Sequence, residues 1–192
     1  EQNLDNKELV GEYVIKAGLA AKYLLALIND ILDMSRIESG KLNLRQDDFT
    51  IESVIQDINT VIYEQAKTRN LSYEVINKTK VGNYYVGDIV KVKQILLNLL
   101  SNAVKFTAPG GYVRLLINKE RCSGSMETLK FSVQDNGVGI EKKFQKKIFQ
   151  PFEQGESGLK STYKGTGLGL AICKNLVEIM GGSIVVNSVV NV

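Results

Sequence analysis

The sequence predicts an α/β fold, a two-layer sandwich of helices on a mixed sheet, preceded by one long helix. Three observations predict it. Apolar residues recur every three or four positions through residues 6–39, which is a helical period. After residue 40, helical segments alternate with short segments in which every second residue is apolar, as in strands. Two glycine-rich segments, 135–139 and 165–170, lie among the later elements.

Composition limits the classes of function. The 192 residues are 44% hydrophobic and 23% charged, which is ordinary for a globular protein. A net charge of +3 is too small to indicate a nucleic acid or an anionic membrane as partner. Two cysteines make neither a disulfide framework nor a metal cluster, and no apolar run reaches the roughly 20 residues that span a bilayer. The sequence has no histidine, so it contains no histidine base, ligand or phosphate acceptor.

The first predicted element is the long helix of residues 6–39. Two neighbouring apolar seams run along it, one through Leu24 and Ile31 and the other through Leu25 and Ile28. Together they form a wide apolar face, which is typical of a helix inside a bundle. Ser39 and Gly40 should end the helix. We therefore expect two parts, residues 1–40 and 41–192.

The second part should contain short strands and helices in alternation. Asp88 should cap the helix that follows it. The strand pattern covers residues 42–49, 71–77, 84–86, 112–119, 128–134 and 183–187, and the helical pattern covers residues 51–69, 89–107, 142–148 and 170–180. We expect the strands to form one mixed sheet with helices on one face.

The helix through residues 94–107 is unusual because it carries polar groups beside an apolar stripe. Asn98 and Asn102 lie one turn apart, and Lys105 lies just beyond them on the same face. Amide oxygens can coordinate a hard divalent cation, and an ammonium can meet phosphate oxygens. The alternative is two surface asparagines on an ordinary amphipathic helix. The stripe expected to face the core consists of Val92, Ile95, Leu96, Leu99 and Ala103.

The two glycine-rich segments suit a phosphate ligand. Residues 135–139 follow a strand, and residues 165–170 open a helix. A glycine-rich turn at a helix start presents backbone N–H groups and the positive end of the helix dipole. A simple hairpin turn is the alternative for Asp135 and Gly137, and core packing is the alternative for Phe149 and Phe152.

Taken together, these segments resemble the ATP-binding domain of sensor histidine kinases, within the superfamily that includes gyrase-type ATPases. The matching blocks are NLLSNAVKFT (98–107, the N box), DNGVGI (135–140, the G1 box), FQPF (149–152, the F box) and GTGLGL (165–170, the G2 box). Residues 27–42, LINDILDMSRIESGKL, resemble the second helix of the dimerisation and phosphotransfer region. The resemblance places the acceptor histidine on a first helix before residue 1 and a last strand beyond Val192.

The resemblance implies a role for each block. Asp135 would accept a hydrogen bond from the adenine amine, while Gly137, Gly139 and Ile140 would let the backbone approach the nucleotide. Asn102 would bind Mg²⁺. The nucleotide would also contact the second glycine segment through Gly165, Thr166, Gly167, Leu168 and Gly169.

Asn98 and Lys105 would be the catalytic positions. Lys105 would contact the phosphates, and Asn98 stands where hydrolytic members carry a glutamate that activates water. Because an amide cannot take a proton from water, Asn98 indicates storage of ATP for transfer.

Phe149 and Phe152 would clasp the base of an ATP lid, residues 153–164. Many members carry an arginine in this lid, and here Lys160 or Lys164 would contact the phosphates.

The implied protein is the catalytic part of a sensor histidine kinase. It would move the γ-phosphate of Mg-ATP to a histidine outside this sequence and then to a response-regulator aspartate. The implied partners are the phosphoacceptor helix within a homodimer and a receiver domain, with no nucleic acid. The implied location is the cytoplasm, in a parent protein anchored in a membrane. The alternatives are a gyrase-type ATPase and a degenerate nucleotide-binding interaction module.

Overall fold

The structure is a computed structural model that describes residues 7–79, 83–124, 126–153 and 166–190. The chain divides into two compact units, residues 1–42 and 43–192. Lys160, Lys164 and Gly165, together with the rest of the predicted lid beyond Glu153, lie outside the described residues.

The first unit contains one helix, α1 (Lys7–Glu38), close to the predicted span. Gly40 ends it with a φ of 64°. The Gly40 N–H donates to the Ile37 carbonyl and the Lys41 N–H donates to the Arg36 carbonyl, both at 3.0 Å. These paired bonds form a Schellman motif, which needs a residue with positive φ after the last turn. Glycine adopts that conformation without strain, and the helix therefore ends here.

The second unit contains a mixed three-stranded sheet in the order β2-β4-β5. Its strands are β2 (Ser72–Asn77), β4 (Tyr112–Ser123) and β5 (Met126–Asp135). β2 runs parallel to β4, whereas β4 and β5 form the antiparallel hairpin that the sequence predicts.

The expectation of one continuous sheet is wrong, because two strands pair separately. β1 (Asp47–Thr50) and β3 (Tyr84–Gly87) form a two-stranded antiparallel ribbon. Each has four residues and runs directly into a helix, so the ribbon ends before either strand could extend the larger sheet. Leu42 and Leu44, which we expected in the first strand, precede β1.

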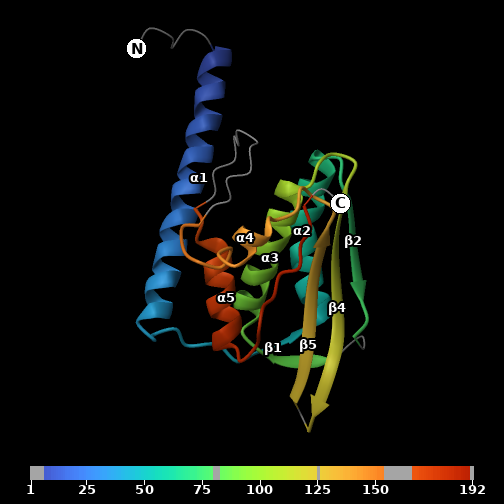
Figure 1. The fold of residues 1–192 in the computed structure, drawn as a ribbon. Helices are drawn as coiled ribbons and strands as arrows, with labels where there is room; N and C mark the ends of the chain where they lie inside the picture. The colour runs from blue at the N-terminus through green and yellow to red at the C-terminus, as the bar shows by residue number, and fades with distance from the viewer. Residues whose placement is uncertain (1–6, 80–82, 125, 154–165, 191–192) are drawn as a thin grey trace. The chain divides into compact units, whose positions relative to one another are not determined.

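Helices α2 (Ile51–Thr68) and α3 (Ile89–Phe106) cover one face of the three-stranded sheet (Figure 1). α5 (Gly169–Ile179) packs on α3. Side chains from both layers are fully buried between them, including Ile58 of α2, Leu100 of α3 and Leu115 of β4. The two-layer α/β fold class is therefore confirmed.

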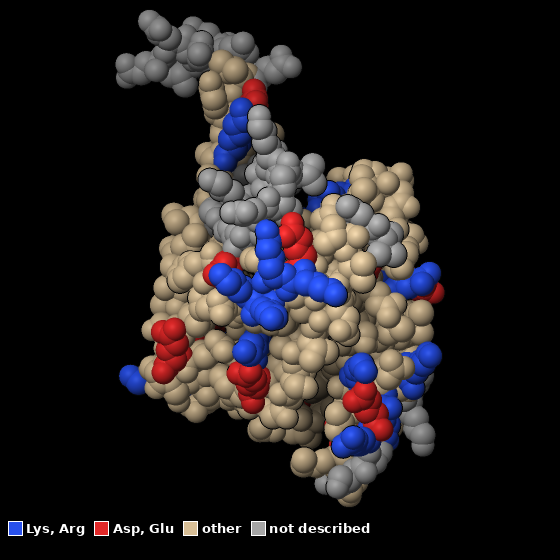
Figure 2. Space-filling view, viewed as in Figure 1, with Lys and Arg blue, Asp and Glu red and all other residues tan. Residues whose placement is uncertain are grey.

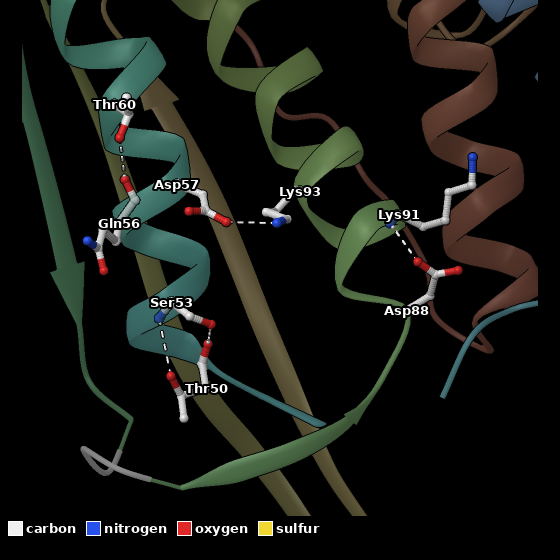
Figure 3. Close-up of polar contacts among 8 residues, drawn as sticks. All are labelled: Thr50, Ser53, Gln56, Asp57, Thr60, Asp88, Lys91 and Lys93. Carbon is white, nitrogen blue, oxygen red and sulfur yellow. Dashed lines mark hydrogen bonds and ion pairs between the residues drawn. The ribbon is translucent and has the colours of Figure 1, made fainter. Parts of the chain in front are cut away.

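Both long helices of this unit begin at a side-chain cap (Figure 3). The Thr50 hydroxyl accepts from the Ser53 N–H at 3.2 Å, and the Asp88 carboxylate accepts from the Lys91 N–H at 2.9 Å. The second cap is the one predicted for Asp88. Since each cap satisfies an N–H that the helix leaves unpaired, these two residues fix where α2 and α3 start.

Two predicted elements differ from the structure. α4 (Lys142–Gln145) is shorter than the predicted 142–148 and continues as turns. Lysines at 142, 143, 146 and 147 form like-charge pairs at the i,i+4 spacing, which destabilises a helix. Residues 183–187 are not a strand. Their half-buried and exposed side chains do alternate, but within the described chain no ladder of backbone hydrogen bonds joins them to a neighbour.

Across the described ranges, no helix has both the length and the apolar character needed to cross a membrane.

Candidate functional site

The polar face of α3 brings Asn98, Asn102 and Lys105 together. Asn102 Nδ2 donates to Asn98 Oδ1 at 3.4 Å, and both side chains are half-buried. The amide donor of Asn102 thus points at Asn98, which leaves its own oxygen, Oδ1, as the atom that can take a ligand. Lys105 Nζ lies 4.9 Å from the centroid of the Phe106 ring, and burial lowers the Lys105 pKa below its usual 10.5. A partly desolvated ammonium is well suited to meet an anion.

The apolar face of α3 is rotated slightly from the predicted stripe. Ile95, Leu96 and Ala103 are buried as expected, whereas Val92 and Leu99 are only half-buried. Leu100 and Val104 are buried instead. The four-residue spacing from Leu96 through Leu100 to Val104 was the signal that could have identified them.

The G1 box lies against the end of α3. The Val138 N–H donates to the Phe106 carbonyl at 3.3 Å. A Cβ atom at Gly137 would lie 2.5 Å from the same carbonyl oxygen, so only glycine allows this approach. Asp135 Oδ1 accepts from the Gly137 N–H at 2.9 Å, a local turn contact, but β5 is followed by α4 in the described chain, so this turn is not the hairpin of the alternative interpretation. Because the Asp135 side chain is exposed, its second oxygen still faces solvent and can accept from a ligand.

The other end of the G1 box contacts the last described segment of the chain. Gly139 has a φ of 73°, and a Cβ there would lie 2.1 Å from the Val189 carbonyl oxygen. The Ile140 N–H donates to Ser188 Oγ at 2.8 Å. Gln145 Nε2 donates to the carbonyls of Ile140 and Ser188 at 2.6 and 2.8 Å. Sequence reasoning missed Ser188 and Gln145, since these contacts join residues far apart in the chain and belong to no motif.

The G2 box meets α3 at Asn98. Gly169 begins α5, and a Cβ atom there would lie 2.4 Å from Asn98 Nδ2. The described structure shows no side-chain cap on α5, unlike α2 and α3, so its first N–H groups are available to a ligand. Thr166 Oγ1 accepts from the Leu168 N–H at 3.2 Å, while the Leu168 side chain is buried. The Leu168 carbonyl accepts from the Ile172 N–H at 2.9 Å, so Leu168 helps to fix the start of α5 and its own polar groups are already paired.

The F box is joined to the G2 box through the backbone. The Phe152 N–H donates to the Gly167 carbonyl at 2.9 Å, which ties together the two ends of the predicted lid. Phe152 has a φ of 63° and is 71% exposed, so the core alternative is wrong for this residue. Phe149 is half-buried. A phenylalanine held exposed in a left-handed conformation is characteristic of functional segments.

These contacts place the G1 and G2 boxes along one helix, α3. Asn98 touches the G2 box, and Phe106 touches the G1 box. Eight residues of helix separate them, which is about 12 Å at 1.5 Å per residue. The arrangement suits an elongated ligand, with a group that a carboxylate recognises at one end and phosphates at the other. The described residues include no cluster of three or more histidine, cysteine or acidic side chains that could hold a metal.

The fold and the boxes define a class of ATP-binding domain. The family described as "Histidine kinase-, DNA gyrase B-, and HSP90-like ATPase" matches residues 87–191, more than half of the sequence, and the chain belongs to this family. Within the family it carries the ATP-binding catalytic domain found in sensor histidine kinases. The predicted family is therefore confirmed.

Relatives and a solved structure support this assignment. The sensory/regulatory protein RpfC of Xanthomonas campestris pv. campestris (strain 8004) is 41% identical over 168 residues, covering 86% of this chain and 23% of RpfC. The sensor histidine kinase GacS of Pseudomonas protegens is 40% identical over 169 residues, covering 88% of this chain and 18% of GacS. Full-length ShkA in complex with AMPPNP superposes with a TM-score of 0.73 at 27% identity, covering 92% of this chain and 36% of ShkA. The chain thus spans about a fifth of the length of these curated relatives.

Proposed function

We propose that this chain is the catalytic part of a sensor histidine kinase, transferring the γ-phosphate of Mg-ATP to a histidine on another helix. The observation that carries the proposal is the placement of both glycine boxes on α3, at Asn98 and at Phe106. From the acceptor histidine, the phosphoryl group would pass to an aspartate on a response regulator.

The G1 box would select the base. Asp135 presents an exposed carboxylate that can only accept hydrogen bonds, so it matches the exocyclic amine of adenine and repels a carbonyl. Gly137 and Gly139 keep the backbone free of Cβ atoms that would displace Phe106 or Val189. These glycines therefore hold the carboxylate at a fixed place beside the end of α3, with Ile140 held by Ser188.

Asn102 would contribute the ligand to Mg²⁺. Its Nδ2 is directed to Asn98, and an amide oxygen is a suitable ligand for a hard cation. Mg²⁺ usually keeps waters and substrate phosphates in its coordination shell, so one protein oxygen is a sufficient contribution. When bound, Mg²⁺ would neutralise part of the phosphate charge.

Asn98 and Lys105 would serve transfer rather than hydrolysis. The Asn98 amide cannot accept a proton from water, and Gly169 holds α5 against it. Lys105 supplies a positive charge to the phosphates from the same helix. Phosphoryl transfer depends mainly on position and charge, and these residues provide both. Phe149 and Phe152 would hold the base of a lid in which Lys160 or Lys164 reaches the phosphates.

The acceptor must come from another segment, since the sequence has no histidine. We propose that α1 is the second helix of a dimerisation and phosphotransfer hairpin, whose first helix carries the acceptor. The apolar residues exposed on α1, such as Val14 at 65% and Leu25 at 61%, would then be covered in a homodimer. We place the domain in the cytoplasm of a membrane-anchored parent protein, where it would meet a receiver domain.

The test combines nucleotide binding with labelling. The chain should bind ATP more tightly with Mg²⁺, release phosphate only at background rate, and take no label from γ-labelled ATP. Adding the phosphoacceptor helix of a relative such as GacS should give label on that helix, and acid should remove it because phosphohistidine is acid-labile. Rapid phosphate release would instead indicate a gyrase-type ATPase. Absence of nucleotide binding would indicate a degenerate interaction module.

A further inference from the structure

Four lysines gather on α4 and on the turn that follows it. They are Lys142, Lys143, Lys146 and Lys147, and all four are exposed. Figure 2 shows basic side chains crowded over α4, the densest positive region on that face of the molecule. Like charges at this spacing weaken the helix that carries them. Since no core packing depends on these exposed side chains, the fold gives no reason for the cluster.

The lysines are only partly neutralised by nearby acids. Glu141 pairs with Lys143 at 3.0 Å, and Glu153 lies 3.9 Å from Lys147. Lys142 and Lys146 form no ion pair within the part of the chain that the structure describes. Within the described residues, Lys142 and Lys146 therefore keep positive charges that no ion pair offsets.

The lysine cluster is held at the edge of the nucleotide site by contacts on both sides. On one side, Gln145 of α4 donates to the Ile140 carbonyl at the end of the G1 box. On the other, Lys147 lies near Glu153, directly after Phe152, whose N–H bonds to Gly167 of the G2 box. The excess positive charge is thus tied to both segments between which the triphosphate would enter.

We propose that Lys142 and Lys146 steer the triphosphate of ATP toward this site by long-range electrostatic attraction, without contacting the bound nucleotide. The proposal deepens the proposed function and rests on it. Charges in water act over about 10 Å at 0.1 M salt, and a surface of one sign raises association rates by about 10- to 1000-fold. The dissociation rate is set instead by short-range contacts, which here belong to α3 and the glycine boxes.

Steering is useful here because the site itself carries mixed charge. Asp135 is an exposed carboxylate and would repel an approaching polyanion, while Lys105 is half-buried and partly desolvated. An acidic protein surface could also fit four lysines. The hydrogen bond from Gln145 of α4 to the Ile140 carbonyl of the G1 box favours the nucleotide, because a protein-docking patch would need no such connection to the site.

The test is stopped-flow binding of a fluorescent ATP analogue to the double variant Lys142→Gln/Lys146→Gln. At about 20 mM salt we expect the association rate constant to fall about 3- to 10-fold, with the dissociation rate constant unchanged. At about 0.5 M salt the difference should nearly vanish, since screening removes long-range attraction. The matched control is Lys67→Gln/Lys78→Gln, which removes the same net charge from exposed positions on α2 and after β2 and should leave both rate constants within about twofold.

Three results would overturn the steering. If the association rate constant of the double variant depends on salt in the same way as that of the unaltered protein, the two lysines do not attract the ligand. A faster dissociation rate would show that they touch it directly, and an equal fall in the control would assign the effect to net charge. In each of these the unaltered protein still binds the analogue, so the proposed function stands. Failure of the unaltered protein to bind would reject the proposed function and the steering together.

Discussion

Helices α1 and α2 both carry apolar residues at helical spacing but bury them to opposite extents. On α2, Val54, Ile58 and Ile62 are fully buried against the sheet and α3. On α1, Val14 and Leu25 are more than half exposed. Helical periodicity thus predicts which face of a helix is apolar, but it does not say what covers that face. The apolar face of α2 stabilises the nucleotide-binding unit, whereas apolar residues of α1 stay exposed.

The largest expected effect is on the free energy of unfolding. It appears when the same leucine-to-alanine substitution is made at a buried position of α3 and at an exposed position of α1. Leu100→Ala in α3 removes a fully buried side chain and should lower the free energy of unfolding by about 2–5 kcal/mol. Leu25→Ala in α1 should change it by less than about 0.5 kcal/mol in dilute solution, where the chain is monomeric, because the Leu25 side chain is 61% exposed. Urea unfolding of the nucleotide-free protein measures both.

The control for these two variants is to repeat the unfolding measurements at several protein concentrations. If Leu25→Ala costs as much as Leu100→Ala, the α1 face is covered in solution, and the cost should then grow with concentration as it does for a dimer. A large cost that does not depend on concentration would contradict our view of α1 as an uncovered surface.

The second prediction compares an alanine substitution at two glycines of the site, Gly139 and Gly169. The two differ in which atoms the added Cβ would contact. At Gly139 the neighbour is the Val189 backbone and φ is 73°, so Gly139→Ala should destabilise the fold by about 1–3 kcal/mol. At Gly169 the neighbour is the Asn98 amide, a side chain that can rotate away. Gly169→Ala should therefore leave stability within about 1 kcal/mol while weakening ATP binding. Thermal unfolding with and without ATP distinguishes the two, and equal destabilisation would contradict this account of the contacts.

The third effect concerns a residue that serves the ligand and not the fold. Asp135→Asn keeps an oxygen that can accept from the Gly137 N–H, so unfolding should change by less than about 0.5 kcal/mol. Its new amine would face the adenine amine, and ATP binding should weaken by about 1–3 kcal/mol. Titration calorimetry measures the loss. Unchanged affinity would remove Asp135 from the adenine site.

The features that the sequence predicted are those fixed by nearby residues. The Asp88 cap, the Gly40 stop and the hairpin of β4 and β5 each depend on contacts or patterns within a few residues. The separate β1–β3 ribbon could not be predicted, because alternation does not say which strand pairs with which. The same holds for residues 183–187, whose alternation is present but pairs with no strand among the described residues. Pairing is a property of the whole chain.

The candidate site also contains both residues that the sequence predicted and residues that it could not predict. Asn98, Asn102 and Lys105 share a face because of helical spacing, and the structure joins Asn98 and Asn102 by a hydrogen bond as that spacing allows. Ser188 and Gln145, which hold the end of the G1 box, lie outside every motif. They act through hydrogen bonds between a side chain and distant backbone atoms, and such bonds leave no periodic pattern in a sequence.

The smallest expected effect is on stability and concerns Lys105, whose side chain is neither fully buried nor fully exposed. Lys105 is half-buried, and burial lowers its pKa below 10.5 in the folded protein. Between that lowered pKa and 10.5 the unfolded chain binds more protons than the folded one, so the free energy of unfolding rises with pH through this window. Below the window the fold bears the full cost of desolvating the ammonium. Lys105→Met removes that cost, so at neutral pH the variant should be slightly more stable than the unaltered protein while binding ATP more weakly. Unfolding measured from pH 7 to 11 should show the advantage of the variant disappearing as the lysine becomes neutral. A variant less stable at pH 7 would show that the contact of the ammonium with the Phe106 ring, at 4.9 Å, outweighs its desolvation.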